Sequence, residues 1–495
     1  MKKYKKSIVV ILSLLTMSCG DYFDKEPIGL ITQEQISSDP TEQSIVSAVN
    51  STYQMYSQTL NVIGEWDWTG GKVLRNDFII YDIASGDMLK KWNPDGDQAW
   101  MDEVGSFNFT SINGAFNGAW SYSFEAISRA NTAISILEQD HITSNTGMSQ
   151  NLIDRLLAES LFLRALSYFE LVNNFGDVPM ITVPLDSFAD AYEVSVRRPA
   201  SEVWQLIMSD LQKASSLLPQ AKFSSQSEPW RVSKGAVLSL IAKAELYQEN
   251  YQNVISIISQ IEDLGFYSLN VHYFDSFDVT KHFQENEVIF AYDHQEGRNP
   301  RKGNGLAALM GWGFVAPSES FVQAFEQGDP RLFYTVDLTN RNVNKLLGTK
   351  NGLYKGNDDS PGNKIYIRYA DVLLWKAEAL IKLGNIEQGL LIVDMVRLRA
   401  KNTPYVNGTL PDPSILAPYA GRGLNQAEAL QALIQERRVE LGFESHRFND
   451  LKRWGIALDI LRDMGKNFQA HHMLFPIPQE EVDRSGGLIN QNQGY

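Results

Sequence analysis

The sequence predicts an all-α fold in which paired helices pack together and long loops with minor β-structure decorate them. Apolar residues recur at helical spacing in many segments of the 495-residue chain. Capping residues and Gly or Pro breaks bound several of these segments. Two long stretches between them, 60–117 and 266–353, lack this periodicity and are expected to be loop-rich insertions.

The predicted helices each carry an apolar stripe and begin or end at a recognisable signal. Thr41 or Asp39 is the expected cap of the first helix, and Ser233 is the expected cap of another. Gly176 provides a left-handed stop that Pro179 reinforces. The predicted helices cover residues 41–58, 119–139, 151–174, 200–218, 234–248 and 251–264.

Two helix pairs are similar to tetratricopeptide repeats, in which small residues allow close helix contact. The first covers 234–264 and includes Ala242 and Ala244, and the second covers 369–398 and includes Ala377 and Gly384 near its turn. No strict period of about 34 residues is present, so the repeats are expected to be irregular.

Tryptophans surrounded by glycines mark both unpatterned stretches. The chain contains 10 Trp and 20 Tyr, and this aromatic content argues against disorder. The second stretch is also expected to hold a short strand at 287–292 and a helix that Ser318 caps and that ends at Glu326. Five of the tryptophans stand out: Trp66, Trp68, Trp92, Trp100 and Trp312.

The N-terminus reads as a secretory signal, because four lysines precede a short apolar run, 8–15. Residues 1–18 are therefore expected to be removed. Cys19, the only cysteine of the chain, follows in the position of a bacterial lipobox cysteine, although Leu15 is one place further out than usual. We predict lipidation of Cys19, with ordinary cleavage beside a chance cysteine as the alternative. No disulfide can then form.

The formal net charge of −15 excludes several classes of partner. A nucleic-acid-binding protein needs a basic surface, and no basic cluster follows residue 18. Attraction to anionic lipid is likewise unfavourable, so the lipid on Cys19 is the expected link to a membrane.

Charged residues are densest in the stretch Ile434 to Gly455, which reads as a helix, a break at Gly442 and a second helix. We interpret its Arg and carboxylate groups as a structural lock of ion pairs between helices. A clamp for an anion or another substrate is the alternative.

Several motifs in this order resemble the SusD/RagB-like nutrient-binding outer-membrane lipoproteins of Bacteroidetes, over nearly the whole mature chain. The resemblance rests on Cys19 with its acidic tether and on segments shared in sequence and order. They are 164–169 (RALSYF), 175–179 (FGDVP), 368–374 (RYADVLL), 436–441 (ERRVEL) with 443–444 (FE), 447–448 (RF), 450–451 (DL) and 453–455 (RWG), then 476–478 (PIP) and 491–495 (QNQGY).

The resemblance implies one globular unit, 19–495, with an N-terminal region 22–220, a C-terminal region 285–495 and four tetratricopeptide-like helix pairs. It implies a non-catalytic, surface-exposed lipoprotein that binds glycan and acts as a lid on a SusC-like, TonB-dependent transporter. The acidic tether (Asp21, Asp24 and Glu26) is similar to signals that send such lipoproteins to the exterior of the outer membrane.

A sugar ligand requires aromatic faces edged by polar groups. The predicted ligand-binding residues are Trp66, Asp67, Trp68, Arg75, Asn76, Trp92, Trp100 and Trp312. Each ring can instead anchor its own loop to the helices, and we expect at least two of the five to contact ligand.

No cofactor or metal site is predicted. The segment 93–97 (NPDGD) reads as a tight turn rather than a cation site, and His471 and His472 read as a surface pair. No nucleophile elbow, phosphate-binding loop or dinucleotide fingerprint is present. A surface glycoside hydrolase, or a receptor for peptide or another nutrient, remains the alternative, and the sequence does not identify the polysaccharide.

Overall fold

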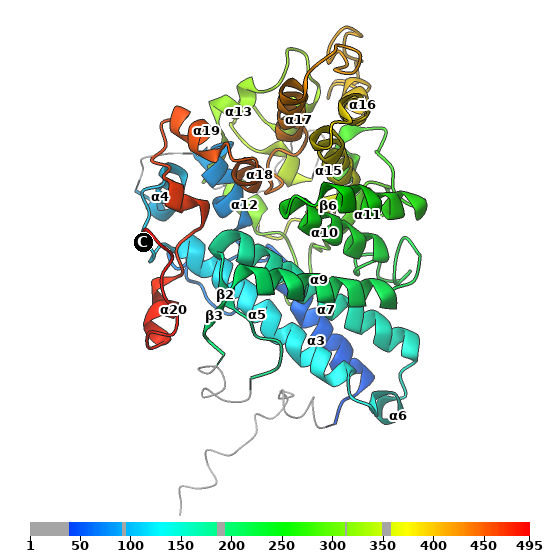
Figure 1. Cartoon of the computed structure of the whole chain (residues 1–495), viewed down its shortest axis with the longest axis vertical. Coiled ribbons are helices and arrows are strands. Elements are labelled where there is room, and N and C mark those ends of the chain that lie inside the picture. The colour runs from blue at the N-terminus through cyan, green and yellow to red at the C-terminus, as the bar shows by residue number, and fades with distance from the viewer. Residues whose placement is uncertain (1–38, 92–95, 186–193, 312–313, 349–357) are drawn as a thin grey trace, which may run out of the picture.

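The computed structural model describes residues 39–91, 96–185, 194–311, 314–348 and 358–495 (Figure 1). Most of these residues are helical and the strands are short, which confirms the predicted all-α fold class. The predicted signal segment 1–18, Cys19 and the acidic tether lie outside the described residues.

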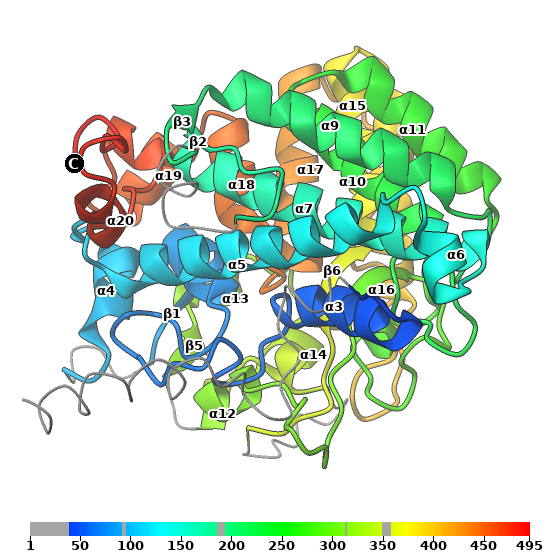
Figure 2. The ribbon, with the colours of Figure 1, turned by 90° about the horizontal axis from the view of Figure 1, so that it is seen from below.

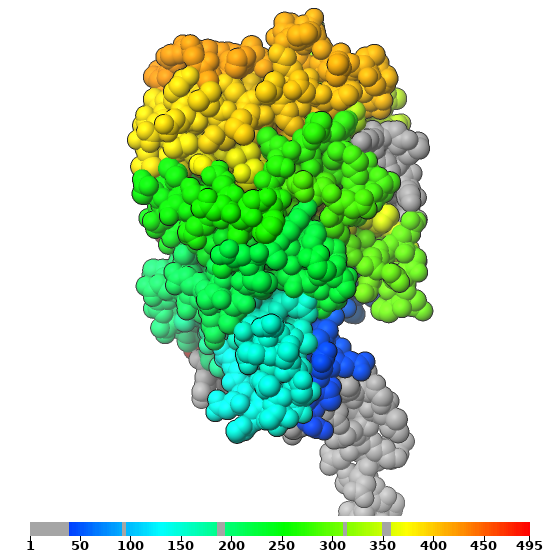
Figure 3. All heavy atoms as spheres, turned by 90° about the vertical axis from the view of Figure 1, so that its right-hand side faces the viewer, coloured from blue at the N-terminus to red at the C-terminus, as the bar shows by residue number. Residues whose placement is uncertain are grey.

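The main helices follow one another through the molecule in chain order. In Figure 3 the surface colour changes from cyan through green to yellow and orange along the long axis. Neighbouring helices in the series pack on each other. The helices α3 to α11 and part of α15 share one large apolar core, and α15, α16 and α17 enclose a second, smaller one. They are α3 (Glu42–Gln54), α5 (Gly114–Leu137), α7 (Gln150–Phe175), α9 (Ala200–Leu217), α10 (Lys234–Tyr247), α11 (Tyr251–Asp263), α15 (Tyr369–Lys382), α16 (Ile386–Lys401) and α17 (Gln426–Glu440).

The predicted helix signals operate as expected. Thr41 caps α3 through a bond from the Ser44 backbone N–H to its hydroxyl (3.1 Å), and Ser233 caps α10 by accepting from Ala236 N–H (3.2 Å). Gly176 ends α7 with a φ of 73°, in the left-handed region that favours glycine. Helix ends were therefore readable from local sequence.

Shorter elements fill the insertions and the C-terminal region. Three two-stranded antiparallel sheets are present among the described residues: β1 with β5, β2 with β3 and β4 with β6. The strands are β1 (Met88–Lys90), β2 (Val178–Pro179), β3 (Arg197–Arg198), β4 (Val288–Tyr292), β5 (Val315–Pro317) and β6 (Lys364–Arg368). The short helices are η1 (Phe78–Ile83), α4 (Ala99–Ser106), α6 (Ile142–Thr146), η2 (Tyr273–Ser276), α12 (Leu306–Gly311), α13 (Glu319–Gln323), α14 (Arg331–Thr335), η3 (Asn344–Leu347), α18 (Arg447–Arg453), α19 (Ala457–Asp463), η4 (Ala470–Met473) and α20 (Gln479–Arg484).

The stretch 60–117 is more ordered than its sequence pattern indicated. It contains the π-helix η1, the helix α4 and the start of α5, and all six residues of η1 are buried. Because η1 is buried on every side, it has no exposed polar face and therefore no stripe that sequence periodicity can detect. The predicted strand at 287–292 and the Ser318-capped helix are both present, although α13 ends at Gln323 rather than at Glu326.

The charged stretch Ile434 to Gly455 is a lock between helices, as predicted. Arg437 of α17 donates to Asp450 of α18 (2.9 Å) and to Asp371 of α15 (2.8 Å). Arg453 joins Asp450 (2.8 Å) and Glu378 of α15. These charged groups pair with one another inside the protein, which favours the structural lock over a clamp for an external anion.

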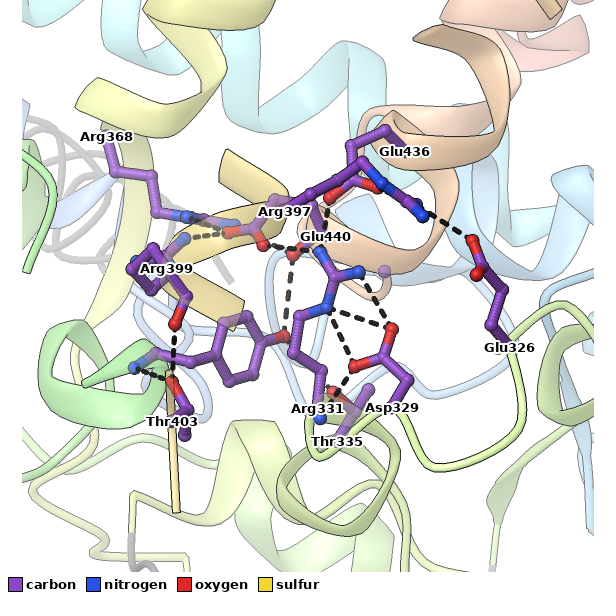
Figure 4. Close-up of polar contacts among 12 residues, drawn as sticks. Glu326, Asp329, Arg331, Thr335, Arg368, Arg397, Arg399, Thr403, Glu436 and Glu440 are labelled. Carbon is purple, nitrogen blue, oxygen red and sulfur yellow. Dashed lines mark hydrogen bonds and ion pairs between the residues drawn. The ribbon is translucent and has the colours of Figure 1, made fainter. Parts of the chain in front are cut away.

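A second set of buried ion pairs ties α17 to the insertion between α11 and α15 (Figure 4). Arg331 of α14, fully buried, binds Asp329 (2.8 Å), Glu436 (2.6 Å) and Glu440 (3.0 Å). Arg368, at the end of β6, also binds Glu440 (2.7 Å). The insertion is therefore anchored to the helical body through α17.

Candidate functional site

Two loop regions that are distant in sequence meet on one side of the molecule. Strand β1 pairs with β5, with Lys90 opposite Val315, and the Lys91 N–H donates to the Phe314 carbonyl (2.9 Å). The Thr59 hydroxyl similarly donates to the Gly303 carbonyl (2.9 Å). In Figure 2, β1, β5, α12 and α14 gather on the opposite side of α5 from α9, α10 and α11. The two predicted loop regions thus form one face.

A tight turn at 65–72 projects from this face. The Asp67 carboxylate accepts from the Gly70 N–H (2.7 Å), and the Asp67 carbonyl accepts from the Lys72 N–H (3.0 Å). Lys72 also pairs with Glu65 (3.3 Å). Asp67 therefore holds the shape of the turn, and the turn leaves Trp66 62% exposed.

The ring of Trp68 lies on Phe314. Their centroids are 6.4 Å apart and the planes differ by 21°, which is a stacked arrangement. Trp66, Trp68 and Phe314 are referred to below as the aromatic platform. The C–H faces of a sugar ring pack on such aromatic surfaces, whereas neighbouring polar groups bind hydroxyls. Sequence reasoning missed Phe314, whose only signal was its position two residues after Trp312.

A polar turn lies next to the platform. The Lys91 ammonium donates to Asn342 Oδ1 (3.1 Å) and to the Asn340 carbonyl. The Asp337 carboxylate accepts from the N–H groups of Thr339 (2.9 Å) and Asn340 (3.0 Å). Burial acts to raise the pKa of Asp337, but the bonds from Asn340 and Thr339 lower it overall. The carboxylate therefore stays ionised and fixes the turn.

Arg75 does not belong to this face. It is 4% exposed and binds Asp77 (3.0 Å), Glu170 and the Met55 carbonyl (2.9 Å). Burial lowers the pKa of Arg75, but Asp77 and Glu170 raise it well above its ordinary value. A guanidinium whose donors serve internal partners has a structural role, so we leave Arg75 out of the candidate site.

Asn76 and Trp100 are also buried. Asn76, 3% exposed, donates to the Ala115 carbonyl (3.2 Å). Trp100, 9% exposed, belongs to the hydrophobic core, and its indole N–H donates to Gln98 Oε1 (2.6 Å). Both residues anchor their loop to the body, which was the alternative considered for each tryptophan. Trp92 and Trp312 lie outside the described residues.

His471 and His472 do not form a surface pair, because His472 is 4% exposed. Its ring packs against Phe107 and Phe109 at 5.3 and 5.1 Å. Burial and, to a smaller extent, the neighbouring His471 together lower the pKa of His472 to about 4. In the part of the chain that the structure describes, no three His, Cys, Asp or Glu side chains are grouped to hold a metal ion. Nor does any helix there have the length and apolar character needed to cross a membrane.

Comparisons with known proteins agree with the fold. A family model described as "SusD family" matches residues 333–495, and one described as "starch-binding associating with outer membrane" matches residues 35–246. SusD-like protein P2 of Formosa agariphila is 27% identical, and the alignment covers 100% of both chains. A SusD-like protein of Bacteroides ovatus is 23% identical over 91% of this chain and 82% of its own.

Solved structures resemble the chain over nearly its full length. A laminarin-binding SusD-like protein is 25% identical with a TM-score of 0.71, covering 92% of this chain and 100% of its own. Surface glycan-binding protein A of Bacteroides fluxus, 22% identical, shares the fold with a TM-score of 0.72 over 92% of this chain and 100% of its own. The two family models match the N-terminal and C-terminal parts of the chain, and the alignments with the relative from Formosa agariphila and with the laminarin-binding structure also cover the part between them. This chain therefore belongs to the SusD/RagB-like family.

Proposed function

We propose that this protein is a non-catalytic, glycan-binding lipoprotein that captures oligo- or polysaccharide at the aromatic platform. The observation that carries the proposal is an exposed Trp66 in the same turn as Trp68, whose ring stacks on Phe314. We also propose that Trp92 and Trp312, which lie outside the described residues, contact the bound glycan.

Family membership supports this choice of ligand class. The 25% identical relative is described as laminarin-binding, which makes laminarin and its oligosaccharides the first ligands to test. The aromatic platform also fits the flat faces of a glucan better than it fits a charged nutrient, because the side chains of its three members are uncharged.

The test is binding of laminarihexaose by calorimetry, together with affinity electrophoresis against a panel of native polysaccharides. Trp66→Ala is expected to weaken binding by at least about tenfold, or about 1.4 kcal/mol. The melting temperature should stay nearly unchanged, since Trp66 is largely exposed. Phe333→Ala is the matched control, because Phe333 is an exposed aromatic residue outside the platform. Retention of full affinity by Trp66→Ala would contradict the assignment of the platform.

The absence of catalysis is a separate part of the proposal. Release of reducing sugar from the same polysaccharide panel measures it directly. We expect no turnover, and turnover by the purified protein that is lost on substituting carboxylates near the platform would replace this proposal with a glycoside hydrolase.

Delivery of glycan to a SusC-like, TonB-dependent transporter completes the proposed function. The protein is proposed to be held on the exterior of the outer membrane by lipid on Cys19. Cys19→Ala should release it from the membrane fraction while leaving its affinity for glycan unchanged. Co-purification of the lipidated protein with a transporter from solubilised outer membranes tests the partnership, and its isolation without one would count against the proposal.

A further inference from the structure

A second concave site lies away from the aromatic platform. It is a hollow of about 240 Å³ between the C-terminal end of α3, the segment before α10 and the segment after β4. It is lined by Asn50, Tyr53, Gln54, Glu228, Trp230, Tyr292, Asp293, Gln295 and Lys302. All nine are described residues, and the comparisons assign no role to any of them. We refer to this site as the Trp230 hollow.

The rings of the hollow are held in fixed positions. Trp230 is half-buried and packs edge-on against Tyr53, with centroids 5.1 Å apart and planes at 89°. The guanidinium of Arg231 lies 4.6 Å from the Trp230 ring centre. Arg231 is in turn fixed by Glu159 (2.7 Å) and Glu228 (2.7 Å). Trp230 is thus preorganised, so little entropy is lost when a ligand packs on it.

The polar rim of the hollow is also ordered. The Gln295 N–H donates to the Lys302 carbonyl (3.1 Å), and the Gln295 side chain donates to Asp293 (2.6 Å). Asn50 accepts from Arg231 (3.0 Å), which fixes one amide at the opposite wall. Amide and charged groups therefore surround the rings on opposite sides, as recognition of a polyhydroxylated ligand requires.

The charges of the hollow favour an uncharged ligand. Glu228 and Glu159 share Arg231, and Glu159 also pairs with Arg155 (3.6 Å), so these four charges balance. The remaining carboxylate, Asp293, is matched by the exposed cation Lys302. Neither an anion nor a cation would meet a surplus of opposite charge. The volume is just below the range of about 300 to 1,000 Å³ typical of sites for drug-sized ligands, so a short portion of a glycan is the expected occupant.

We propose that the Trp230 hollow is a second carbohydrate-binding site, separate from the aromatic platform. This inference rests on the proposed glycan-binding function. The two sites lie at the ends of one segment, 55–64, which follows Gln54 and leads into the turn that carries Trp66. Bonds from Thr59 to Gly303 and from the Gln58 N–H to His294 Nε2 (3.1 Å) hold that segment against the loop that carries Lys302. One long glycan, or two short ones, can then occupy both sites.

The test compares Trp66→Ala, Trp230→Ala and the double variant for binding of laminarihexaose and maltohexaose, with stoichiometry measured by native mass spectrometry. Trp204→Ala is the matched control, because Trp204 is also half-buried and edge-on to an aromatic ring (Phe169, 5.6 Å, 82°) but lies outside the hollow. Gln54→Ala with Lys302→Ala removes rim groups without changing the core, in case Trp230→Ala fails to fold.

The expected result is two bound hexasaccharides for the unmodified protein and one for Trp66→Ala. Trp230→Ala, or Gln54→Ala with Lys302→Ala, should also bind one, at the platform. The double variant Trp66→Ala with Trp230→Ala should bind none, and Trp204→Ala should bind two. A single equivalent that Trp66→Ala abolishes and the hollow variants leave intact would overturn the second site while leaving the proposed function in place. Binding lost only in the hollow variants would support the hollow and reject the platform. No binding of any glycan by the unmodified protein would overturn both.

Discussion

Glu440→Gln removes the carboxylate at the centre of the buried ion pairs in Figure 4. Glu440 is fully buried, and its oxygens accept from Arg331 (3.0 Å), Arg368 (2.7 Å) and Arg399. Each guanidinium keeps another carboxylate, Glu287 in the case of Arg399 (2.8 Å). The variant therefore weakens three charge-assisted bonds without leaving any arginine entirely unpaired.

The expected loss is about 3–5 kcal/mol of unfolding free energy, the range for breaking a buried ion pair by removing one partner. Urea unfolding followed by circular dichroism measures it. Glu480→Gln is the control, because Glu480 pairs with Arg484 on the surface and its side chain is 46% exposed. Exposed pairs of this kind contribute at most about 0.5 kcal/mol.

The pH dependence gives an independent check. Burial acts to raise the pKa of Glu440, but Arg399, Arg368 and Arg331 hold it well below its ordinary range. A carboxylate with a lowered folded-state pKa stabilises fully above its unfolded pKa of about 4.3, and this contribution is lost as the pH falls further. The difference between Glu440→Gln and the unmodified protein should therefore shrink below about pH 4. A loss under about 1 kcal/mol at pH 7, or a difference that grows in acid, would refute the reasoning.

Three further predictions concern Asp82, Gly71 and Arg438. Burial raises the pKa of Asp82 to about 7, so between about pH 4 and 7 the folded protein holds a proton on Asp82 that the unfolded chain has lost. The unfolding free energy should therefore fall by about 4 kcal/mol as the pH rises through that window. Asp82→Asn should flatten this part of the curve of unfolding free energy against pH. Gly71→Ala should lower the unfolding free energy, measured with urea, by at least about 2 kcal/mol, because φ is +72° and the new Cβ would lie 1.9 Å from the Gly114 carbonyl oxygen. Gly64→Ala is the control: its φ is +79° but the space around it is open, so the loss should be about 1 kcal/mol. Arg438 donates to Asp87, the residue before β1, so Arg438→Met should lower the unfolding free energy by about 2 kcal/mol or more and also weaken laminarihexaose binding. Unchanged affinity would show that the platform does not depend on Arg438.

Much of the fold could be predicted because helix signals are local. The stripe, the cap and the stop of each main helix lie within a few residues of one another, as Ser233 for α10 and Gly176 for α7 illustrate. The π-helix η1 could not be predicted from periodicity, because all of its residues are buried and it has no exposed polar face that alternates with an apolar one. The ion-pair lock was predicted in kind from charge density, but its partners Arg331 and Arg368 come from distant segments.

The candidate site was predictable only in part, because residue type does not reveal exposure. Trp66 and Trp100 have the same chemistry and similar glycine-rich surroundings, yet one is 62% exposed and the other 9%. Phe314 stacks on Trp68 from a segment that is distant in the chain, and this long-range contact has no local sequence signal. The Trp230 hollow was missed for the same reason, since three separate segments build it.

The lock and the aromatic platform are physically connected, which bears on why charges are so dense in α17. Arg438 donates twice to the carboxylate of the buried Asp87 (2.9 and 2.7 Å), immediately before β1. The Asp87 carbonyl accepts from the Ser318 N–H (2.8 Å), immediately after β5. α17 thereby fixes the end of the β1–β5 pair opposite to Phe314. A helix rich in buried charge can hold such strands firmly, because each ion pair has few alternative geometries once it is removed from water.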